Sequence, residues 1–302
     1  MTAISSERTG SAATGRRPPS RRGFGAGLGL VPFAAYLLLF LAIPAVLAIG
    51  SGLFDAAGRF APGNLLALFD PVVLGTFWNS IWLSALTAGI GVVVGFVLCY
   101  ALQGFPPGGA VRTIVDAASS MLAQFGGVML AFAIIATIGL QGLVTVWLRT
   151  AFGIDLFASG PWLYGMPGLV IAYVYFQVPL MVITFMPALT ALRPQWVEAT
   201  LTLGGTRGTF WRRVALPLLA PSLLASFLLL FANSFSAYAT AAALASQGSP
   251  IVPLQIRTAL TSETVLGRQN QAGVLALGMI VVMAVVMWAY SWMSRRASRW
   301  QA

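Results

Sequence analysis

The sequence predicts an all-α membrane protein with six transmembrane helices. Of its 302 residues, 58% are hydrophobic and only 8% are charged, and the mean hydropathy is +0.86. A soluble domain is about 45 to 50% apolar and about 25% charged, so this composition is typical of a chain inside a bilayer. The apolar residues form long runs separated by arginines, which is the pattern of helices that cross the membrane repeatedly.

Each predicted helix is long enough to cross the hydrocarbon core, which takes about 20 residues. Because the number of helices is even, both termini should lie on the same side of the membrane. Residues 1–27, rich in Ser, Gly, Pro and Arg, are expected to be a disordered tail, and residues 294–302 a second tail. Residues 28–293 then form the transmembrane domain, with helices at residues 28–50, 76–102, 114–140, 166–192, 216–238 and 273–293.

The arginines indicate the orientation. With six helices, thirteen of the seventeen arginines fall in the two tails and the second and fourth loops, and four fall on the other side. Positive residues accumulate on the cytoplasmic side of membrane proteins, so both termini are expected in the cytoplasm. The dispersal of the arginines along membrane boundaries also argues against a nucleic-acid-binding surface, which would need them clustered on one face.

Missing residue types exclude most chemistry. The chain has no lysine and no histidine, so a GxxxxGK[ST] phosphate loop, a Schiff-base lysine, a Ser-His-Asp triad and the common zinc sites are excluded. The single cysteine, Cys99, cannot form an intrachain disulfide and is expected to be buried. We therefore expect no enzyme activity in this chain, no cofactor and no metal.

Ionisable residues are almost absent from the predicted helices. Asp116 lies near Arg112 at the start of the third helix, where an interfacial ion pair is favoured over a proton relay within the membrane. Ion-coupled carriers usually place carboxylates near the midplane, and this chain offers none there. Small residues such as Gly91, Gly95 and the Gly126–Gly127 pair indicate close helix packing. Prolines that should break or bend the fourth helix are Pro167, Pro179 and Pro187.

The fourth loop, residues 193–217, predicts two short helices. Pro194 and the Gly204–Gly205 pair bracket the first, which one of these glycines should end by adopting the left-handed conformation. Thr206 is a candidate N-cap for the second helix, which should run to Val214, before Pro217 begins the fifth membrane helix. The two helices would expose several apolar side chains to water, which indicates a docking surface. These are Trp196 and Leu203, on one face with Thr200, and Phe210 and Trp211.

The spacing of a short motif within this loop is similar to that of a known protein family. Glu198-Ala199-Thr200 is followed by Gly204 six positions after the glutamate, and by Leu216-Pro217 eighteen and nineteen positions after it. This resembles the EAA loop of ABC importer permeases, the binding-protein-dependent transport system inner-membrane component family, in which alanine usually stands where Thr200 does. A weaker resemblance extends from Asn79-Ser80 to the last helix, and the layout is most similar to permeases of polyamine-type importers.

The resemblance implies a type I ABC importer permease fold and a transport function. By analogy with the family, the loop contains a coupling helix that docks on a separate ATP-hydrolysing subunit dimer. The residues that match the family motif are Glu198, Ala199, Thr200, Gly204 and Leu216-Pro217. A second permease chain, identical or related, and an extracytoplasmic solute-binding protein are the other implied partners, in the bacterial cytoplasmic membrane. The alternative is a secondary transporter or channel that works without ATP. The residues indicate this class of transporter, and they do not identify the solute.

A second polar feature lies at residues 231–240, toward the outer end of the fifth helix. Side chains here can line a water-filled path or gate, or they can be hydrogen-bonding contacts between helices. Helical spacing places Asn233, Ser236 and Thr240 on one face and two phenylalanines on another. The gate candidates are Asn233, Ser236, Tyr238 and Thr240, and the loop that follows, residues 241–271, is expected to contact an external binding protein.

Overall fold

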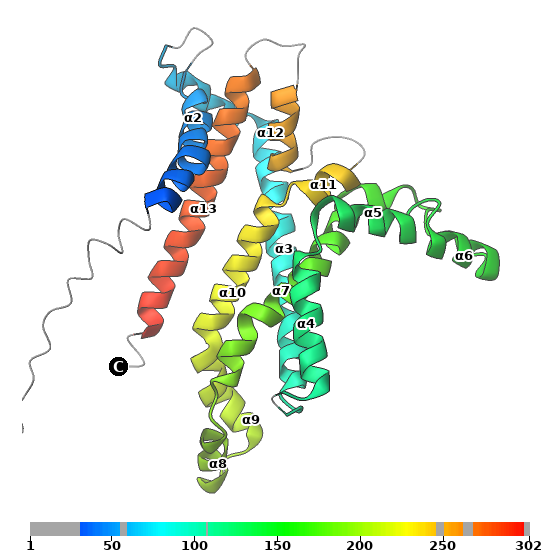
Figure 1. The fold of residues 1–302 in the computed structure, drawn as a ribbon, viewed down its shortest axis with the longest axis vertical. Helices are drawn as coiled ribbons and strands as arrows, with labels where there is room; N and C mark the ends of the chain where they lie inside the picture. Colours follow the sequence, from blue (N-terminus) through cyan, green and yellow to red (C-terminus); the bar gives the residue numbers. More distant parts are fainter. Residues whose placement is uncertain (1–30, 55–58, 107, 246–250, 262–267, 299–302) are drawn as a thin grey trace, which may run out of the picture. The chain divides into compact units, whose positions relative to one another are not determined.

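The computed structural model describes residues 31–54, 59–106, 108–245, 251–261 and 268–298. The first predicted tail, residues 1–27, lies outside this part, whereas residues 294–298 of the second predicted tail are the end of α13. The chain divides into two compact units, residues 1–47 and residues 48–302. Figure 1 shows that the described residues are mostly helical. The elements are η1 (Leu38–Ala42), α2 (Ile43–Ser51), η2 (Pro62–Phe69), α3 (Pro71–Leu102), α4 (Ala110–Gln124), α5 (Gly127–Ile138), α6 (Leu143–Phe152), η3 (Trp162–Tyr164), α7 (Met166–Thr190), α8 (Pro194–Thr202), α9 (Arg207–Phe210), η4 (Trp211–Ala215), α10 (Leu216–Ser236), α11 (Ala239–Leu244), α12 (Val252–Thr261) and α13 (Arg268–Ser298).

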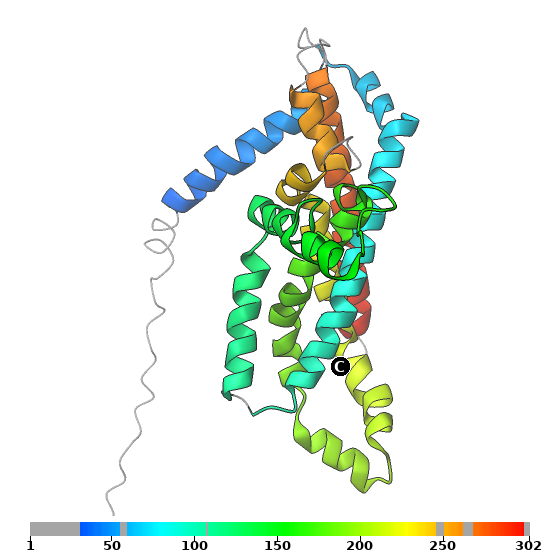
Figure 2. The same cartoon turned by 90° about the vertical axis from the view of Figure 1, so that its right-hand side faces the viewer.

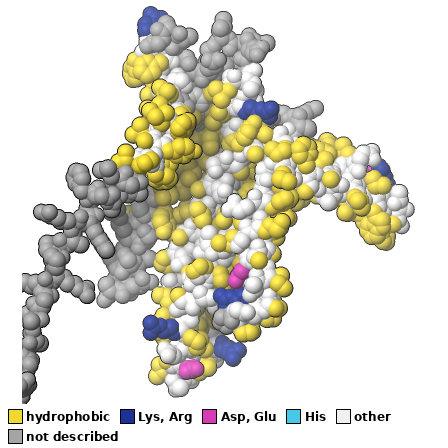
Figure 3. Space-filling model, in the orientation of Figure 1, with side chains coloured by type: hydrophobic (Ala, Val, Ile, Leu, Met, Phe, Trp, Pro, Cys, Tyr) yellow, Lys and Arg dark blue, Asp and Glu magenta, His cyan; other side chains and the backbone are white. Residues whose placement is uncertain are grey.

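The predicted all-α membrane fold is confirmed. Within the described residues, five helical segments are long and apolar enough to cross a bilayer, and a shorter apolar helix, Val31–Leu47, stands where the first was expected. In the larger unit, Figure 3 shows hydrophobic side chains over much of the surface, with basic side chains near α8 and α9. The five segments are Pro71–Leu102, Gly127–Phe152, Met166–Thr190, Arg207–Ser236 and Gln271–Trp292.

Helix α7 is the centre of the larger unit. It contacts α3, α4 and α10, and these helices lie along one another in Figures 1 and 2. The α7 side chains Met181, Phe185 and Leu189 are fully buried in the core. The helix continues through Pro179 and Pro187, so of the expected break or bend the break is not present. Pro167 lies in the first turn, where no intrahelical hydrogen bond is lost.

Glycines on α3 allow it to pack closely against α7, as predicted. A Cβ atom on Gly95 would lie 2.6 Å from Cβ of Met181, and one on Gly91 would lie 3.0 Å from Cβ of Gln177. Cys99 is buried on the same helix, also as predicted. The small residues therefore set the distance between α3 and α7.

The third predicted transmembrane helix, residues 114–140, is wrong as a single element. Helix α4 ends at Gln124, and α5 begins at Gly127 with φ +70°. A continuous right-handed helix cannot contain such a residue, so the chain turns, and Figures 1 and 2 show α5 leaving the direction of α4. The Gly126–Gly127 pair therefore makes a helix break here. The segment long enough to span in this region is Gly127–Phe152, which is α5 and α6 together.

Candidate functional site

The turn between α8 and α9 is built as the sequence predicts. Gly204 follows the end of α8 with φ +79°, a conformation that glycine adopts without steric cost. The amide of Gly205 donates to the carbonyl of Thr200 (2.9 Å), and the amide of Gly204 donates to that of Leu201 (3.0 Å). These two bonds form a Schellman motif, which satisfies the last carbonyls of α8. A Cβ on Gly205 would lie 2.8 Å from the Thr200 carbonyl oxygen, so this position also requires glycine.

The second helix of the loop begins with a capping box. The hydroxyl of Thr206 accepts from the amide of Thr209 (3.2 Å), and the hydroxyl of Thr209 accepts from the amide of Thr206 (3.3 Å). The predicted N-cap at Thr206 is therefore confirmed. The helix then continues into α10 through a π-turn, in which the amide of Leu216 donates to the carbonyl of Trp211. Pro217 explains the π-turn, because its ring removes one donor and crowds the carbonyl four residues earlier.

Helix α8 presents one face to solvent. Gln195, Glu198, Ala199 and Thr202 are exposed, whereas Val197 is partly buried against the ends of the transmembrane helices. The two apolar side chains expected at this surface are both exposed, Trp196 by 37% and Leu203 by 89%. An apolar side chain as exposed as Leu203, on the same turn as the exposed Glu198, has the features of a surface that is covered by a partner.

Two aromatic residues expected at the same surface lie elsewhere. Phe210 is only 3% exposed, so its assignment to the docking surface is wrong. Trp211 is partly buried and packs edge-on against Tyr100 and Phe96 of α3, with ring centroids 5.1 and 6.2 Å away. Because α9 and α10 form one continuous helical segment, these side chains follow the buried face of α10 and anchor the loop to α3.

The polar end of α10 is organised differently from the prediction. The helix stops at Ser236, where Ala237 turns to ψ 104°, so Thr240 does not continue the face of Asn233 and Ser236. Thr240 is buried at 2% exposure in α11, whereas Asn233, Ser236 and Tyr238 are exposed. The two phenylalanines predicted to share another face are Phe231 and Phe235, and their rings stack with centroids 5.7 Å apart.

The four gate candidates nevertheless line one cavity of about 260 Å³. The opposite wall of this cavity is the break between α4 and α5, with Gly126 and Gly127, and Phe176 of α7 also lines it. Two interruptions of transmembrane helices therefore meet there. Non-helical backbone at membrane depth is tolerated only where it is buried in protein or lines a water-filled cavity, which fits this arrangement.

A buried polar network beside this cavity was missed by sequence reasoning. The hydroxyls of Thr87 on α3 and Ser234 on α10 lie 3.0 Å apart, and Nε2 of Gln177 on α7 donates to Thr87 (3.2 Å). The hydroxyl of Tyr173 donates to the carbonyl of Ala237 (2.6 Å), where α10 ends. Gln177 is the one amide side chain within the fourth apolar segment, and that was the available signal. Its hydrogen bond to Thr87, together with the contact between Thr87 and Ser234, joins α7, α3 and α10.

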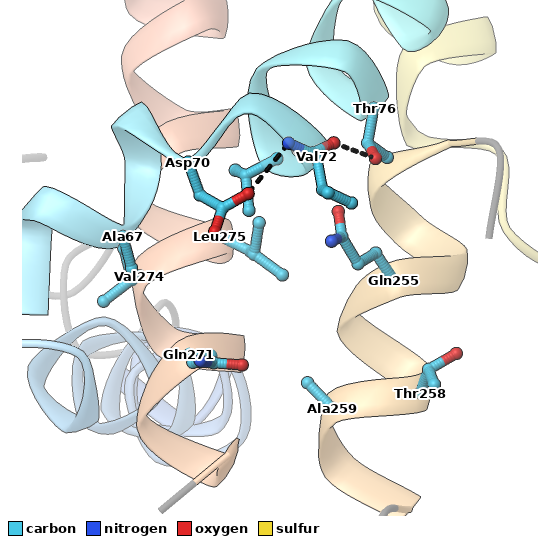
Figure 4. A pocket seen from close by; sticks show the side chains of 11 residues that line it. Ala67, Asp70, Val72, Thr76, Gln255, Thr258, Ala259, Gln271, Val274 and Leu275 are labelled. Carbon is cyan, nitrogen blue, oxygen red and sulfur yellow. Dashed lines mark hydrogen bonds between the residues drawn. The ribbon is translucent and has the colours of Figure 1, made fainter.

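A further cavity of about 440 Å³ lies at the end of the unit opposite α8, where α3 begins. Figure 4 shows Asp70, Gln255 and Gln271 around it, from the start of α3 and from α12 and α13. One carboxylate oxygen of Asp70 accepts from the amide of Val72 (2.8 Å), and Oε1 of Gln255 is buried without a hydrogen-bond partner. The cavity therefore offers acceptor groups at this end of the unit.

Comparison with known families and structures gives a consistent result. A model of the family described as "Binding-protein-dependent transport system inner membrane component" matches residues 143–299, more than half of the chain. A probable ABC transporter permease protein of Sinorhizobium fredii is 28% identical over 271 residues, which cover 86% of this chain and 44% of that protein. The putative ferric transport system permease protein FbpB 1 of Haemophilus influenzae is 28% identical over 201 residues, covering 66% and 31%. The chain thus spans less than half the length of these two relatives.

Among solved structures, a chain of a bacterial alginate ABC transporter, in complex with an alginate pentasaccharide-bound periplasmic protein, is similar in fold. The TM-score is 0.73 at 17% sequence identity, and the similarity covers 91% of this chain and 95% of that one. At this identity the similarity shows the fold alone.

Proposed function

This chain belongs to the binding-protein-dependent transport system inner-membrane component family, and from that premise we propose that it is the permease subunit of an ABC importer in a bacterial cytoplasmic membrane. It moves a small solute, delivered by an extracytoplasmic binding protein, through an alternating-access path. ATP is hydrolysed by a separate subunit dimer, and a second permease chain completes the path. Membership of this family favours an importer over a secondary transporter or channel that works without ATP.

The observation that carries the proposal is the geometry of α8. Its Schellman motif and the capping box of α9 hold a rigid helical turn, and α8 exposes Glu198, Ala199 and Leu203 in this turn. A coupling element must transmit movement from the ATPase to the transmembrane helices. Here α9 continues into α10 without a flexible linker, and Trp211 joins the segment to α3. A force applied to α8 therefore reaches two transmembrane helices directly.

The cavity where the two helix breaks meet is our candidate for part of the solute path. Asn233, Ser236 and Tyr238 give it exposed polar groups in an otherwise apolar unit. The second cavity, with Asp70 and Gln255, lies at the other end of α3 from α8 and fits contact with the external binding protein. Both assignments rest on the orientation in which α8 lies in the cytoplasm.

The coupling role is tested by reversing the charge on the exposed face of α8. Glu198→Lys should weaken co-purification of the ATPase subunit and lower transport in parallel, because an exposed carboxylate at an interface favours complementary charge. Gln195→Lys is the matched control, since it adds a positive charge on the same helix outside the EAA pattern. Both variants should insert in the membrane normally. Unchanged ATPase binding in Glu198→Lys, or equal losses in both variants, would contradict the coupling role.

The orientation is tested by cysteine labelling in a Cys99→Ser background. Leu203→Cys, at an 89% exposed position next to α8, should be protected from an impermeant thiol reagent in intact cells. Ser159→Cys, exposed in the loop that precedes α7, should react, because α7 separates the two positions. Labelling of Leu203→Cys from outside would reverse the assignment of both termini and of α8 to the cytoplasm.

A further inference from the structure

A third cavity, of about 690 Å³, lies between the ends of the transmembrane helices and the α8–α9 turn. Its lining comes from the end of α3, the start of α4, the end of α7 and both loop helices, and it includes three arginines, Arg112, Arg193 and Arg207. Ligand cavities in proteins typically measure about 300 to 1,000 Å³, so this one has the size of a binding site.

The arginines are poorly neutralised. The side chain of Arg112 is only 16% exposed, yet its ion pair with Asp116 is 4.0 Å long, and that carboxylate is itself 51% exposed. Within the described part of the chain, no acidic side chain pairs with Arg193 or Arg207. A guanidinium has five N–H donors and stays charged, so a largely buried one with a single long contact lacks hydrogen-bond acceptors.

Two helix N-termini add positive potential to the same cavity. Helix α4 begins after Gly109 and α8 begins after Arg193, and in each helix the first turn has no acidic residue and no side-chain cap. Neither first turn therefore has a carboxylate of the kind that commonly stabilises this end of a helix, and in α8 the free amide is that of Gln195, since Pro194 has no N–H and the Trp196 amide donates to the Arg193 carbonyl. With the three arginines, the two N-termini make a site suited to an anion with several oxygen atoms, and phosphate has this chemistry.

The surroundings of the cavity favour a lipid phosphate over a soluble anion. Tyr100 and Phe105 line the cavity and are 52% and 43% exposed. Exposed apolar side chains also lie on the two helices that contribute Tyr100 and Arg112, namely Val97 on α3 and Val111 and Ile114 on α4. Aromatic and arginine side chains at helix ends mark the level of the lipid headgroups, and basic pockets between transmembrane helices bind anionic headgroups.

We propose that this cavity binds the phosphate of an anionic phospholipid, with the acyl chains against the exposed apolar side chains of α3 and α4. The bound lipid would join the α8–α9 turn to the start of α4 by bridging Arg193 and Arg207 to Arg112. This proposal concerns lipid binding by the chain itself, so it stands or falls independently of the role of Glu198.

The test is a lipid titration followed by native mass spectrometry on the full-length chain, purified in detergent with the subunits that accompany it. Phosphatidylglycerol should bind and phosphatidylcholine should bind much more weakly. Arg193→Gln/Arg207→Gln should weaken phosphatidylglycerol binding by about tenfold or more, since each lost guanidinium removes charge-assisted hydrogen bonds. Both side chains are exposed, so the variant should fold.

Arg212→Gln/Arg213→Gln is the matched control, because it removes two exposed arginines from the same segment that do not line the cavity. It should change phosphatidylglycerol binding by less than about twofold, because exposed charges outside the cavity contribute weakly. Three outcomes would overturn the proposal. These are equal losses in both double variants, displacement of the lipid by excess inorganic phosphate, and unchanged lipid binding with loss of the ATPase subunit, which would make the arginines a protein contact.

Discussion

Two of the three Gly–Gly pairs in this chain make short breaks between consecutive helices, and the sequence predicted the break at Gly204–Gly205 but not the break at Gly126–Gly127. At Gly204–Gly205, the helix end is flanked by Pro194 before α8 and by Thr206, which caps α9. At Gly126–Gly127, the flanking residues are small or apolar and no side-chain cap is present. Each pair nevertheless contains one glycine in the left-handed region, with φ +79° at Gly204 and +70° at Gly127. Capping residues therefore mark the first break in the sequence, whereas no side-chain cap marks the second.

The largest effect should come from Gly204→Pro. Proline fixes φ near −65°, so it cannot adopt the observed value of +79°, and the Schellman motif must open. We expect transport and ATPase co-purification to fall by more than about tenfold while membrane insertion persists. Gly208→Ala is the control, because a Cβ there meets only the Thr206 hydroxyl at 3.7 Å. Retained ATPase binding in Gly204→Pro would mean that the turn is not a rigid coupling element.

The break at Gly126–Gly127 should tolerate substitution of Gly126 but not of Gly127. Gly127→Val places a β-branched residue at φ +70° and should lower thermal stability in detergent, with a free-energy loss of about 1 to 2 kcal/mol or more. Gly126→Ala should be close to neutral, because Gly126 has φ −124° and open space around its Cβ position. Equal effects of the two substitutions would show that the break between α4 and α5 does not depend on this conformation.

The Thr206 side chain caps α9, whereas α5 begins without a side-chain cap, so removing the Thr206 hydroxyl tests how much the cap contributes to the first break. Thr206→Ala should destabilise the start of α9 by about 1 kcal/mol and weaken ATPase binding severalfold at most. In the control, Thr202→Ala, the hydroxyl that is lost bonds only to the Ala199 carbonyl within α8, so little should change. A binding assay with the purified ATPase subunit measures both. If Thr206→Ala has no effect, Gly204 and Gly205 hold the turn without the cap.

The smallest effect is expected in the cavity where the break between α4 and α5 meets the end of α10. Asn233→Leu should lower transport severalfold without loss of assembly, because an exposed amide is replaced by an apolar group at the cavity wall. Asn233→Gln keeps the amide and should transport normally. Phe231→Leu should instead reduce stability, since Phe231 is 5% exposed and stacks on Phe235. Transport is compared in membranes with matched levels of the complex, and normal transport by Asn233→Leu would leave the solute path elsewhere.

Features that depend on interactions between near neighbours in the chain were predictable from the sequence, and features that depend on distant residues were not. Thr206 and Gly204 were identified because a cap and a left-handed glycine act on atoms within a few residues. Phe210 was placed on the exposed surface because the continuous helix into α10, which carries it inward, cannot be read from its neighbours. Thr240 was grouped with Asn233 because helical spacing assumes a helix, and α10 ends at Ser236.

The sequence by itself determined the membrane class, most of the spanning segments and the construction of the α8–α9 turn. These follow from composition, from apolar runs of sufficient length and from hydrogen bonds between near neighbours. Only the tertiary structure decided where α4 and α10 stop, which polar groups become partners inside the unit, and how arginines from three separate elements come to surround one cavity. Those features depend on contacts between residues far apart in the chain, and helix packing, which the local sequence does not encode, brings them together.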